Sequence, residues 1–154
     1  MVIIKEQINN DIKDAMRAKN EMNLSVLRML LGSLRNKEIT LRTEGSAVEL
    51  SDEQAMEVIM SEVKKRNDSV TSYLAGGRND LADKENAEIK ILEKYLPAQL
   101  SEEEIAQEVA DVVAAMGGAN VGDFGKVMGQ AMARLKGRAD GNKVGEAVKK
   151  LLAK

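Results

Sequence analysis

Apolar side chains recur every three or four residues along almost the whole chain, which is the spacing of one face of an α-helix. No stretch shows the strict alternation of apolar and polar positions that indicates a β-strand. The pattern therefore predicts an all-α protein. The predicted buried faces of the first three helices are Ile4, Ile8, Ile12 and Met16; Leu27, Leu30, Leu31, Leu34 and Leu41; and Ala55, Val58, Ile59, Val63, Val70, Tyr73 and Leu74.

Capping residues and turns divide this pattern into separate helices. Asn20 or Asn23 can cap the second helix. The connection after that helix falls at residues 45–46, which are Gly and Ser. Ser51 and Gln54 have the spacing of a capping box, which predicts that the third helix begins there.

The third helix is predicted to end at the glycines at 76–77, because glycine readily adopts the positive φ of a helix C-terminus. Asn79 can cap a fourth helix over residues 80–95. That helix must end before Pro97, since proline disfavours α-helical geometry in the residue before it. We therefore predict an N-terminal domain of four helices, residues 1–97.

A second capping box at residues 101–104 opens a C-terminal unit. Its first helix is predicted to stop at the glycines at 117–118, and residues 136–139 form a turn before Asp140, which can cap the last helix. Residues 98–154 are therefore predicted to form a small three-helix domain. The apolar faces of its helices are Ile105, Val109, Val112, Val113 and Met116; Phe124, Val127, Met128, Ala131 and Leu135; and Val144, Val148, Leu151 and Leu152.

Composition limits the chemistry available to the chain. The 154 residues include no Cys and no His, which excludes disulfides, thiolate nucleophiles and catalysis by imidazole. Nothing here needs an oxidising compartment, so we expect a cytoplasmic protein. The apolar run Val2–Ile4 is far too short to span a membrane. Eight of the twelve glycines lie between residues 117 and 145, and the spacing of Gly125 and Gly129 predicts close helix packing there.

Two patterns that could carry catalysis have simpler explanations. Residues 122–127 resemble part of a phosphate-binding loop, but they lack its required residues and follow no predicted strand. Carboxylates gather at residues 102–104 and 80–85, near predicted helix starts, where the helix dipole favours negative charge. We therefore predict no catalytic, cofactor-binding or metal-binding residue. Arg66 falls near the buried side of its helix, where it could pair with a carboxylate across the bundle or bind a phosphate, and we expect the carboxylate pair.

The net charge of −2 hides segments of opposite sign. Residues 101–122 carry five acidic and no basic side chains, whereas residues 123–154 carry eight basic and three acidic ones. Cations at a turn beside a helix N-terminus can bind backbone phosphates. The candidate nucleic-acid-binding residues are Lys126, Arg134, Lys136, Arg138 and Lys143. Because Tyr73, Tyr95 and Phe124 lie on apolar faces, contacts to the backbone of a folded RNA fit better than base stacking.

Several short runs of residues carry a resemblance that covers nearly the whole chain. The most specific runs are Glu93–Pro97 and Lys136–Asp140, and the others are Leu24–Leu30, Arg78–Leu81, Glu88–Ile89 and Met128–Gly129. Together they resemble the GatB/YqeY family, specifically a stand-alone YqeY-like protein.

By this resemblance, the C-terminal unit is similar to the tail domain of the B subunit of glutamine-dependent aminoacyl-tRNA amidotransferase, which contacts the outer corner of tRNA. That tail typically shows Lys-Gly-Lys-Ala-Asn-Pro where residues 136–141 here read Lys-Gly-Arg-Ala-Asp-Gly. The change keeps a helix-capping residue, so we expect the same turn. The catalytic parts of that enzyme have no counterpart in this sequence.

These observations predict a non-catalytic accessory protein that binds tRNA or another folded RNA through its cationic C-terminal residues. Two alternatives remain open. The family resemblance implies a glutamine-dependent carbon–nitrogen ligase, or a component of one. The other alternative is a helical module that binds a protein partner through exposed apolar surface on its first two helices.

Overall fold

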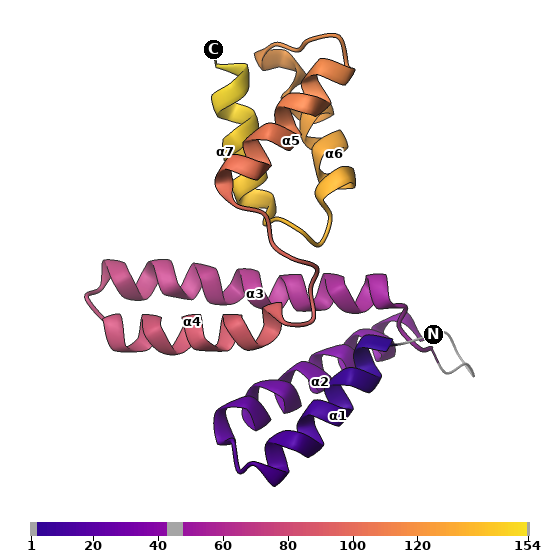
Figure 1. The fold of residues 1–154 in the computed structure, drawn as a ribbon, viewed down its shortest axis with the longest axis vertical. Coiled ribbons are helices and arrows are strands. Elements are labelled where there is room, and N and C mark those ends of the chain that lie inside the picture. The colour runs from indigo at the N-terminus through magenta and orange to yellow at the C-terminus, as the bar shows by residue number, and fades with distance from the viewer. Residues whose placement is uncertain (1–2, 43–47, 154) are drawn as a thin grey trace. The chain divides into compact units, whose positions relative to one another are not determined.

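The chain is all-α, as the periodicity predicts. A computed structural model describes residues 3–42 and 48–153, and these residues form seven α-helices, one 3₁₀ turn and no β-strand (Figure 1). The elements are α1 (Ile3–Arg17), α2 (Glu21–Leu41), α3 (Asp52–Ala75), α4 (Asn79–Glu93), α5 (Glu102–Ala115), η1 (Val121–Asp123), α6 (Phe124–Leu135) and α7 (Gly141–Leu152). The connection expected at residues 45–46 lies outside the described residues.

The helices fall into two compact units, Met1–Leu96 and Pro97–Lys154. The four-helix and three-helix make-up of these units is the predicted one. The boundary lies one residue before the predicted one, so that Pro97 belongs to the C-terminal unit. That each unit is an independently folding domain stays a prediction.

Two helical pairs build the N-terminal unit. Figure 1 shows α1 beside α2 and α3 beside α4, and α2 also contacts both α3 and α4. Their apolar faces meet in one cluster of buried side chains. That cluster contains Ile4, Ile8, Val26, Leu27, Leu30, Leu34, Leu50, Ala55, Ile59, Val63, Ile89, Leu92 and Tyr95.

The predicted buried face of α1 is wrong at its end. Met16 is 53% exposed, whereas Ala15 is buried. Steps of four residues rotate by about 40° beyond a full turn each, so a third step from Ile4 leaves the buried stripe and Ala15 returns to it. Leu41 and Leu74, at the C-terminal ends of α2 and α3, are also exposed rather than buried.

Both predicted capping boxes are present. The Ser51 hydroxyl accepts from the Gln54 amide while the Gln54 side chain accepts from the Ser51 amide, and Ser101 pairs with Glu104 in the same way. A leucine precedes each cap: Leu50 is buried, and Leu100 packs against the C-terminal cluster. This leucine is the hydrophobic staple position, a sequence signal that would have placed both side chains in the core.

The glycine stops also form, and one of them changes the start of α4. Gly77 has a φ of +72°, and the Arg78 amide donates to the Tyr73 carbonyl at 2.8 Å, which closes the C-terminus of α3. Arg78 is also the residue before α4, and its side chain makes no capping hydrogen bond. Asn79 is therefore the first helical residue and not the predicted cap, because the tight turn leaves no separate capping position.

In the C-terminal unit each of α5, α6 and α7 contacts the other two. The cluster they bury contains Ile105, Val109, Val112, Val127, Ala131, Leu135, Ala139, Val144, Val148 and Leu152. The prediction of close helix packing at Gly125 and Gly129 is wrong, because a Cβ built on either residue would meet nothing within 4 Å. Helices α6 and α7 instead approach at Gly141 and Gly145, which face the side chains of two α6 methionines.

Candidate nucleic-acid interface

The turn between α6 and α7 carries the most specific part of the cationic sequence. Gly137 is buried with a φ of +83°, a backbone conformation that favours glycine. The Arg138 amide donates to the Leu135 carbonyl at 2.8 Å. Asp140 caps α7 by accepting from the Asn142 amide at 3.1 Å, so the predicted cap is confirmed. The N-terminal amides of α7 and the cations of the turn therefore lie at one corner of the unit.

A segment from before α5 holds this turn in place. The Leu100 amide donates to the Arg138 carbonyl at 2.9 Å, and the Gln99 side chain donates to the Gly137 carbonyl at 2.8 Å. Sequence reasoning missed both contacts. The staple position would have indicated that the Leu100 side chain packs against the core, but no local pattern marks Gln99, because its partner lies 38 residues away.

Three of the five candidate cations lie at this corner, because they belong to the turn or to the first turn of α7. Lys136 and Arg138 belong to the turn itself, and Lys143 lies in the first turn of α7. Lys136 and Lys143 are exposed, and Arg138 is half-buried. These three residues place positive charge around the N-terminus of α7, where the helix dipole adds to it.

The other two candidate cations have different surroundings. Lys126 is exposed in the first turn of α6, about 15 Å along that helix from the turn at its other end. Arg134 forms a 2.7 Å ion pair with Glu108 and lies 4.0 Å from Asp111, both on α5. The guanidinium of Arg134 therefore joins α6 to α5, and a phosphate would have to compete with two carboxylates for it.

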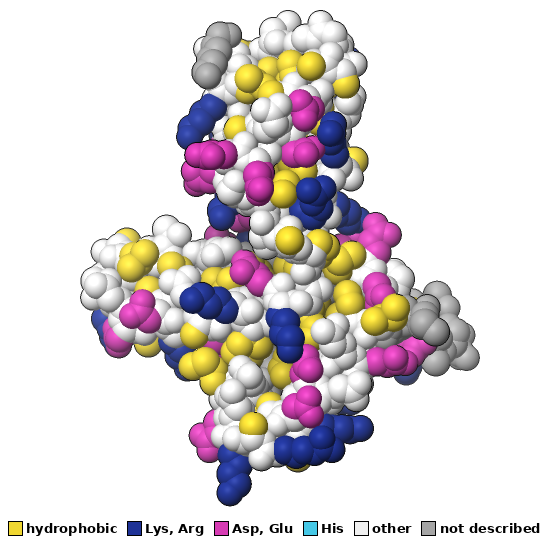
Figure 2. All heavy atoms as spheres, in the orientation of Figure 1, with side chains coloured by type: hydrophobic (Ala, Val, Ile, Leu, Met, Phe, Trp, Pro, Cys, Tyr) yellow, Lys and Arg dark blue, Asp and Glu magenta, His cyan; other side chains and the backbone are white. Residues whose placement is uncertain are grey.

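Acidic and basic side chains share the surface of this unit. Figure 2 shows them intermixed on the visible face of residues 97–154. Three consecutive glutamates, residues 102–104, occupy the exposed first turn of α5, where they complement the helix dipole. An RNA bound at the corner would therefore be repelled by the start of α5, which limits non-specific binding.

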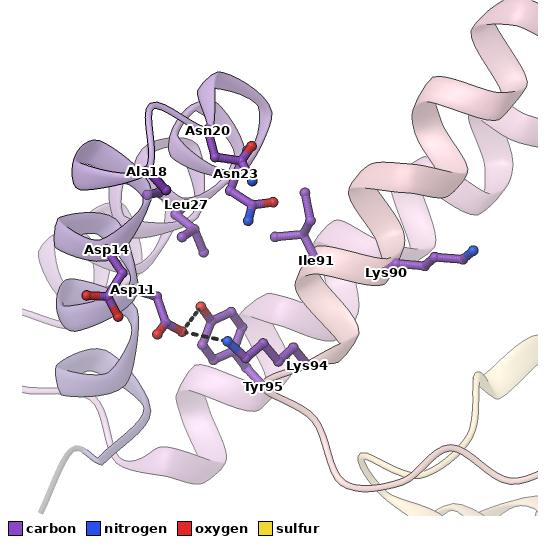
Figure 3. A pocket seen from close by; sticks show the side chains of 11 residues that line it. Asp11, Asp14, Ala18, Asn20, Asn23, Leu27, Lys90, Ile91, Lys94 and Tyr95 are labelled. Carbon is purple, nitrogen blue, oxygen red and sulfur yellow. Dashed lines mark hydrogen bonds and ion pairs between the residues drawn. The ribbon is translucent and has the colours of Figure 1, made fainter.

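The N-terminal unit contains an open groove of about 440 Å³ between α1, the start of α2 and the end of α4. Figure 3 shows Leu27 and Ile91 on opposite sides of this groove, with Asn20 and Asn23 at one end. At the other end the Tyr95 hydroxyl and the Lys94 ammonium both reach one oxygen of Asp11.

The Asp11 cluster ties α1 to the last turn before the connection to the C-terminal unit. The Tyr95 hydroxyl donates to Asp11 at 2.5 Å, and Lys94 lies 3.4 Å from the same oxygen. Burial of the ring, together with the Asp11 carboxylate, raises the pKa of Tyr95 well above its usual range. The Tyr95 hydroxyl keeps its proton and donates it in a hydrogen bond to Asp11. This arrangement fits a structural role for Tyr95.

Arg66 has the structural role that its position predicts. Its guanidinium pairs with Glu62 at 3.0 Å and with Glu88 of α4 at 3.3 Å, and 13% of its side chain is exposed. Burial alone would raise the pKa of Glu62, but hydrogen bonds from Arg66 and Lys65 hold it below its usual value. The network joins α3 to α4 with its charges paired.

Exposed apolar side chains are more numerous on α1 and α2 than elsewhere in the described chain. They are Ile3, Met16, Met22, Ile39 and Leu41. Scattered apolar residues are ordinary on a protein surface, so binding of a protein partner through these helices stays a prediction.

Two further kinds of site, for a metal ion and for a membrane, would need grouped carboxylates or a long apolar helix. Within residues 3–42 and 48–153, no three acidic side chains are placed to hold a metal ion together. No helix in these ranges is long and apolar enough to cross a membrane.

The fold and the corner define a class of protein: two helical units, the second with a cationic helix–turn–helix corner whose turn is fixed by hydrogen bonds. The chain belongs to the family described as Yqey-like protein, whose sequence model matches residues 5–152. The family resemblance stated from the sequence is therefore confirmed.

Curated relatives of this chain come from yeasts. A protein of Saccharomyces cerevisiae named "Altered inheritance of mitochondria protein 41, mitochondrial" is 35% identical over 113 residues, covering 71% of this chain and 58% of the relative. Proteins of the same name from Candida glabrata and Vanderwaltozyma polyspora are 31% and 34% identical over 90 residues each, 58% of this chain. This chain spans about half the length of these relatives.

The expectation of a cytoplasmic protein is wrong, because these relatives are named as mitochondrial. That expectation rested on the absence of cysteine and of a long apolar run. A chain without cysteine has no need of an oxidising compartment, but this does not distinguish the cytoplasm from any other compartment.

Proposed function

We propose that this protein binds tRNA or a similarly folded RNA through the corner formed by Lys136, Arg138 and Lys143. It acts as a non-catalytic accessory protein, and the RNA is held by its phosphate backbone rather than by its bases. Lys126, in the first turn of α6, extends the contact along the helix that precedes the turn.

The observation that carries this proposal is the fixed cationic turn at the start of α7. Gly137, the Asp140 cap and the bonds from residues 99–100 hold its backbone in one conformation. A fixed turn presents its cations at lower entropic cost than a flexible loop. The resemblance of residues 136–141 to the amidotransferase tail supports tRNA as the RNA class.

Charge arrangement supports a backbone contact of modest affinity. Phosphate contacts dominate the affinity of basic proteins for nucleic acids and weaken with salt. None of the three aromatic side chains is fully exposed: Tyr95 is buried, and Tyr73 and Phe124 are half-buried. Stacking of bases on aromatic rings would need more exposed platforms.

Filter binding of total tRNA over a series of salt concentrations tests the proposal. We expect Lys136→Ala/Arg138→Ala in the full chain to bind more weakly and to lower the salt slope by about two, one for each phosphate that is no longer bound. A matched control is Lys149→Ala/Lys150→Ala, which removes the same charge from exposed residues in the last turn of α7. Equal affinity and slope for the two double variants would contradict the proposed site.

A further inference from the structure

We infer that Gln99 is a positioning residue for the RNA-binding turn: its side chain clamps the backbone at Gly137 so that Arg138 and its neighbours face an RNA phosphate in one arrangement. This inference rests on the proposed function for the RNA contact, although the clamp itself is a feature of the fold. Gln99 itself contacts no RNA and acts through the turn.

The orientation of the Gln99 amide follows from its partners. Its nitrogen lies 2.8 Å from the Pro97 carbonyl and 2.8 Å from the Gly137 carbonyl. Both partners are acceptors, so only the amide NH₂ group, with its two donors, can satisfy them together. One side chain therefore links the chain before α5 to the buried glycine of the turn.

A backbone hydrogen bond one residue further on completes the clamp. The Leu100 amide donates to the Arg138 carbonyl at 2.9 Å, and the Leu100 side chain packs against the C-terminal cluster. Two successive carbonyls of the turn, those of Gly137 and Arg138, are thus bound by two successive residues, 99 and 100. Both sides of this contact lie within the unit Pro97–Lys154.

The clamp holds two backbone carbonyls of the cationic turn, those of Gly137 and Arg138. With the carbonyls of Gly137 and Arg138 held, the backbone of the turn has few alternative conformations, and its side chains leave it from fixed Cα–Cβ directions. Without the Gln99 bonds the turn would sample other conformations, and RNA binding would then have to select the competent one. Affinity would fall although every cation of the turn is still present.

Two measurements on the full chain test the clamp, with Gln99→Ala and the nearly isosteric Gln99→Glu, which cannot donate. Hydrogen exchange followed by mass spectrometry should show faster exchange in peptides covering residues 136–140 in both variants. Filter binding of total tRNA should show about fivefold weaker binding for Gln99→Ala, the worth of one hydrogen bond, with the parent's salt slope unchanged.

A matched control is Gln107→Ala on α5, whose exposed side chain donates to Asp111 on the same helix and should change neither measurement. Unchanged exchange in the turn of Gln99→Ala would overturn the clamp. Faster exchange with unchanged tRNA affinity would overturn the positioning role of Gln99, since the turn's order would then not matter for binding. A lower salt slope would make Gln99 a phosphate contact instead. If the parent bound no tRNA, the proposed function would fall and the RNA role of the clamp with it, while the exchange result would still decide whether the clamp exists.

Discussion

At the scale of single residues, the raised pKa of Tyr95 predicts how the free energy of unfolding changes at alkaline pH. The folded chain keeps the Tyr95 proton above the usual pKa of 10.0, because burial and Asp11 favour the neutral phenol, whereas the unfolded chain releases it near that value. The free energy of unfolding should therefore fall as the pH rises above about 10. In Tyr95→Phe this contribution is absent, so its alkaline fall should be shallower.

Urea unfolding from about pH 8.5 to about pH 11 measures the difference between the parent and Tyr95→Phe. At neutral pH we expect Tyr95→Phe to be less stable by about 1.5 kcal/mol, because the Asp11 carboxylate loses a charge-assisted hydrogen bond. Tyr73→Phe is the control, since that tyrosine is half-exposed at the far end of α3. Parallel pH curves for the parent and Tyr95→Phe would contradict the structural role of the Asp11 cluster.

At the scale of the helix, glycines that look alike in the sequence should respond in opposite ways. Gly129 lies inside α6 with open space around it, so Gly129→Ala should stabilise the C-terminal unit by about 0.5–1 kcal/mol through helix propensity alone. Gly77 has a φ of +72°, where an alanine is strained, so Gly77→Ala should destabilise the N-terminal unit by about 1 kcal/mol. Thermal unfolding followed by circular dichroism compares them, and destabilisation by Gly129→Ala would show that α6 packs closely there after all.

The elements also show where prediction from this sequence succeeds and fails. Caps such as Ser51 and Ser101, and the stop at Gly77, depend on residues within one helical turn, so the sequence predicts them. The packing expected at Gly129 depends on which helix lies opposite, whereas the error at Met16 came from continuing four-residue steps beyond the buried stripe of α1. The Gln99 contact depends on a turn 38 residues away. Nothing in the sequence around Gln99 indicates that contact.

At the scale of the whole molecule, each unit completes its own core. The buried cluster of the first unit runs from Ile4 to Tyr95, and that of the second runs from Ile105 to Leu152. We therefore expect residues 1–96 and residues 97–154, made separately, to fold on their own. The shorter piece is near the lower size limit for a stable domain, so its melting should be the broader one.

Circular dichroism of the two pieces should sum to the spectrum of the full chain, and each piece should unfold cooperatively on heating. A third piece, residues 101–154, keeps the C-terminal buried cluster but lacks Gln99 and Leu100. It should retain its helices while hydrogen exchange in residues 136–140 becomes faster than in the piece 97–154. If the piece 97–154 did not unfold cooperatively, the C-terminal unit would need the rest of the chain to fold. The boundary after Leu96 would then separate two groups of contacts but not two independently folding domains.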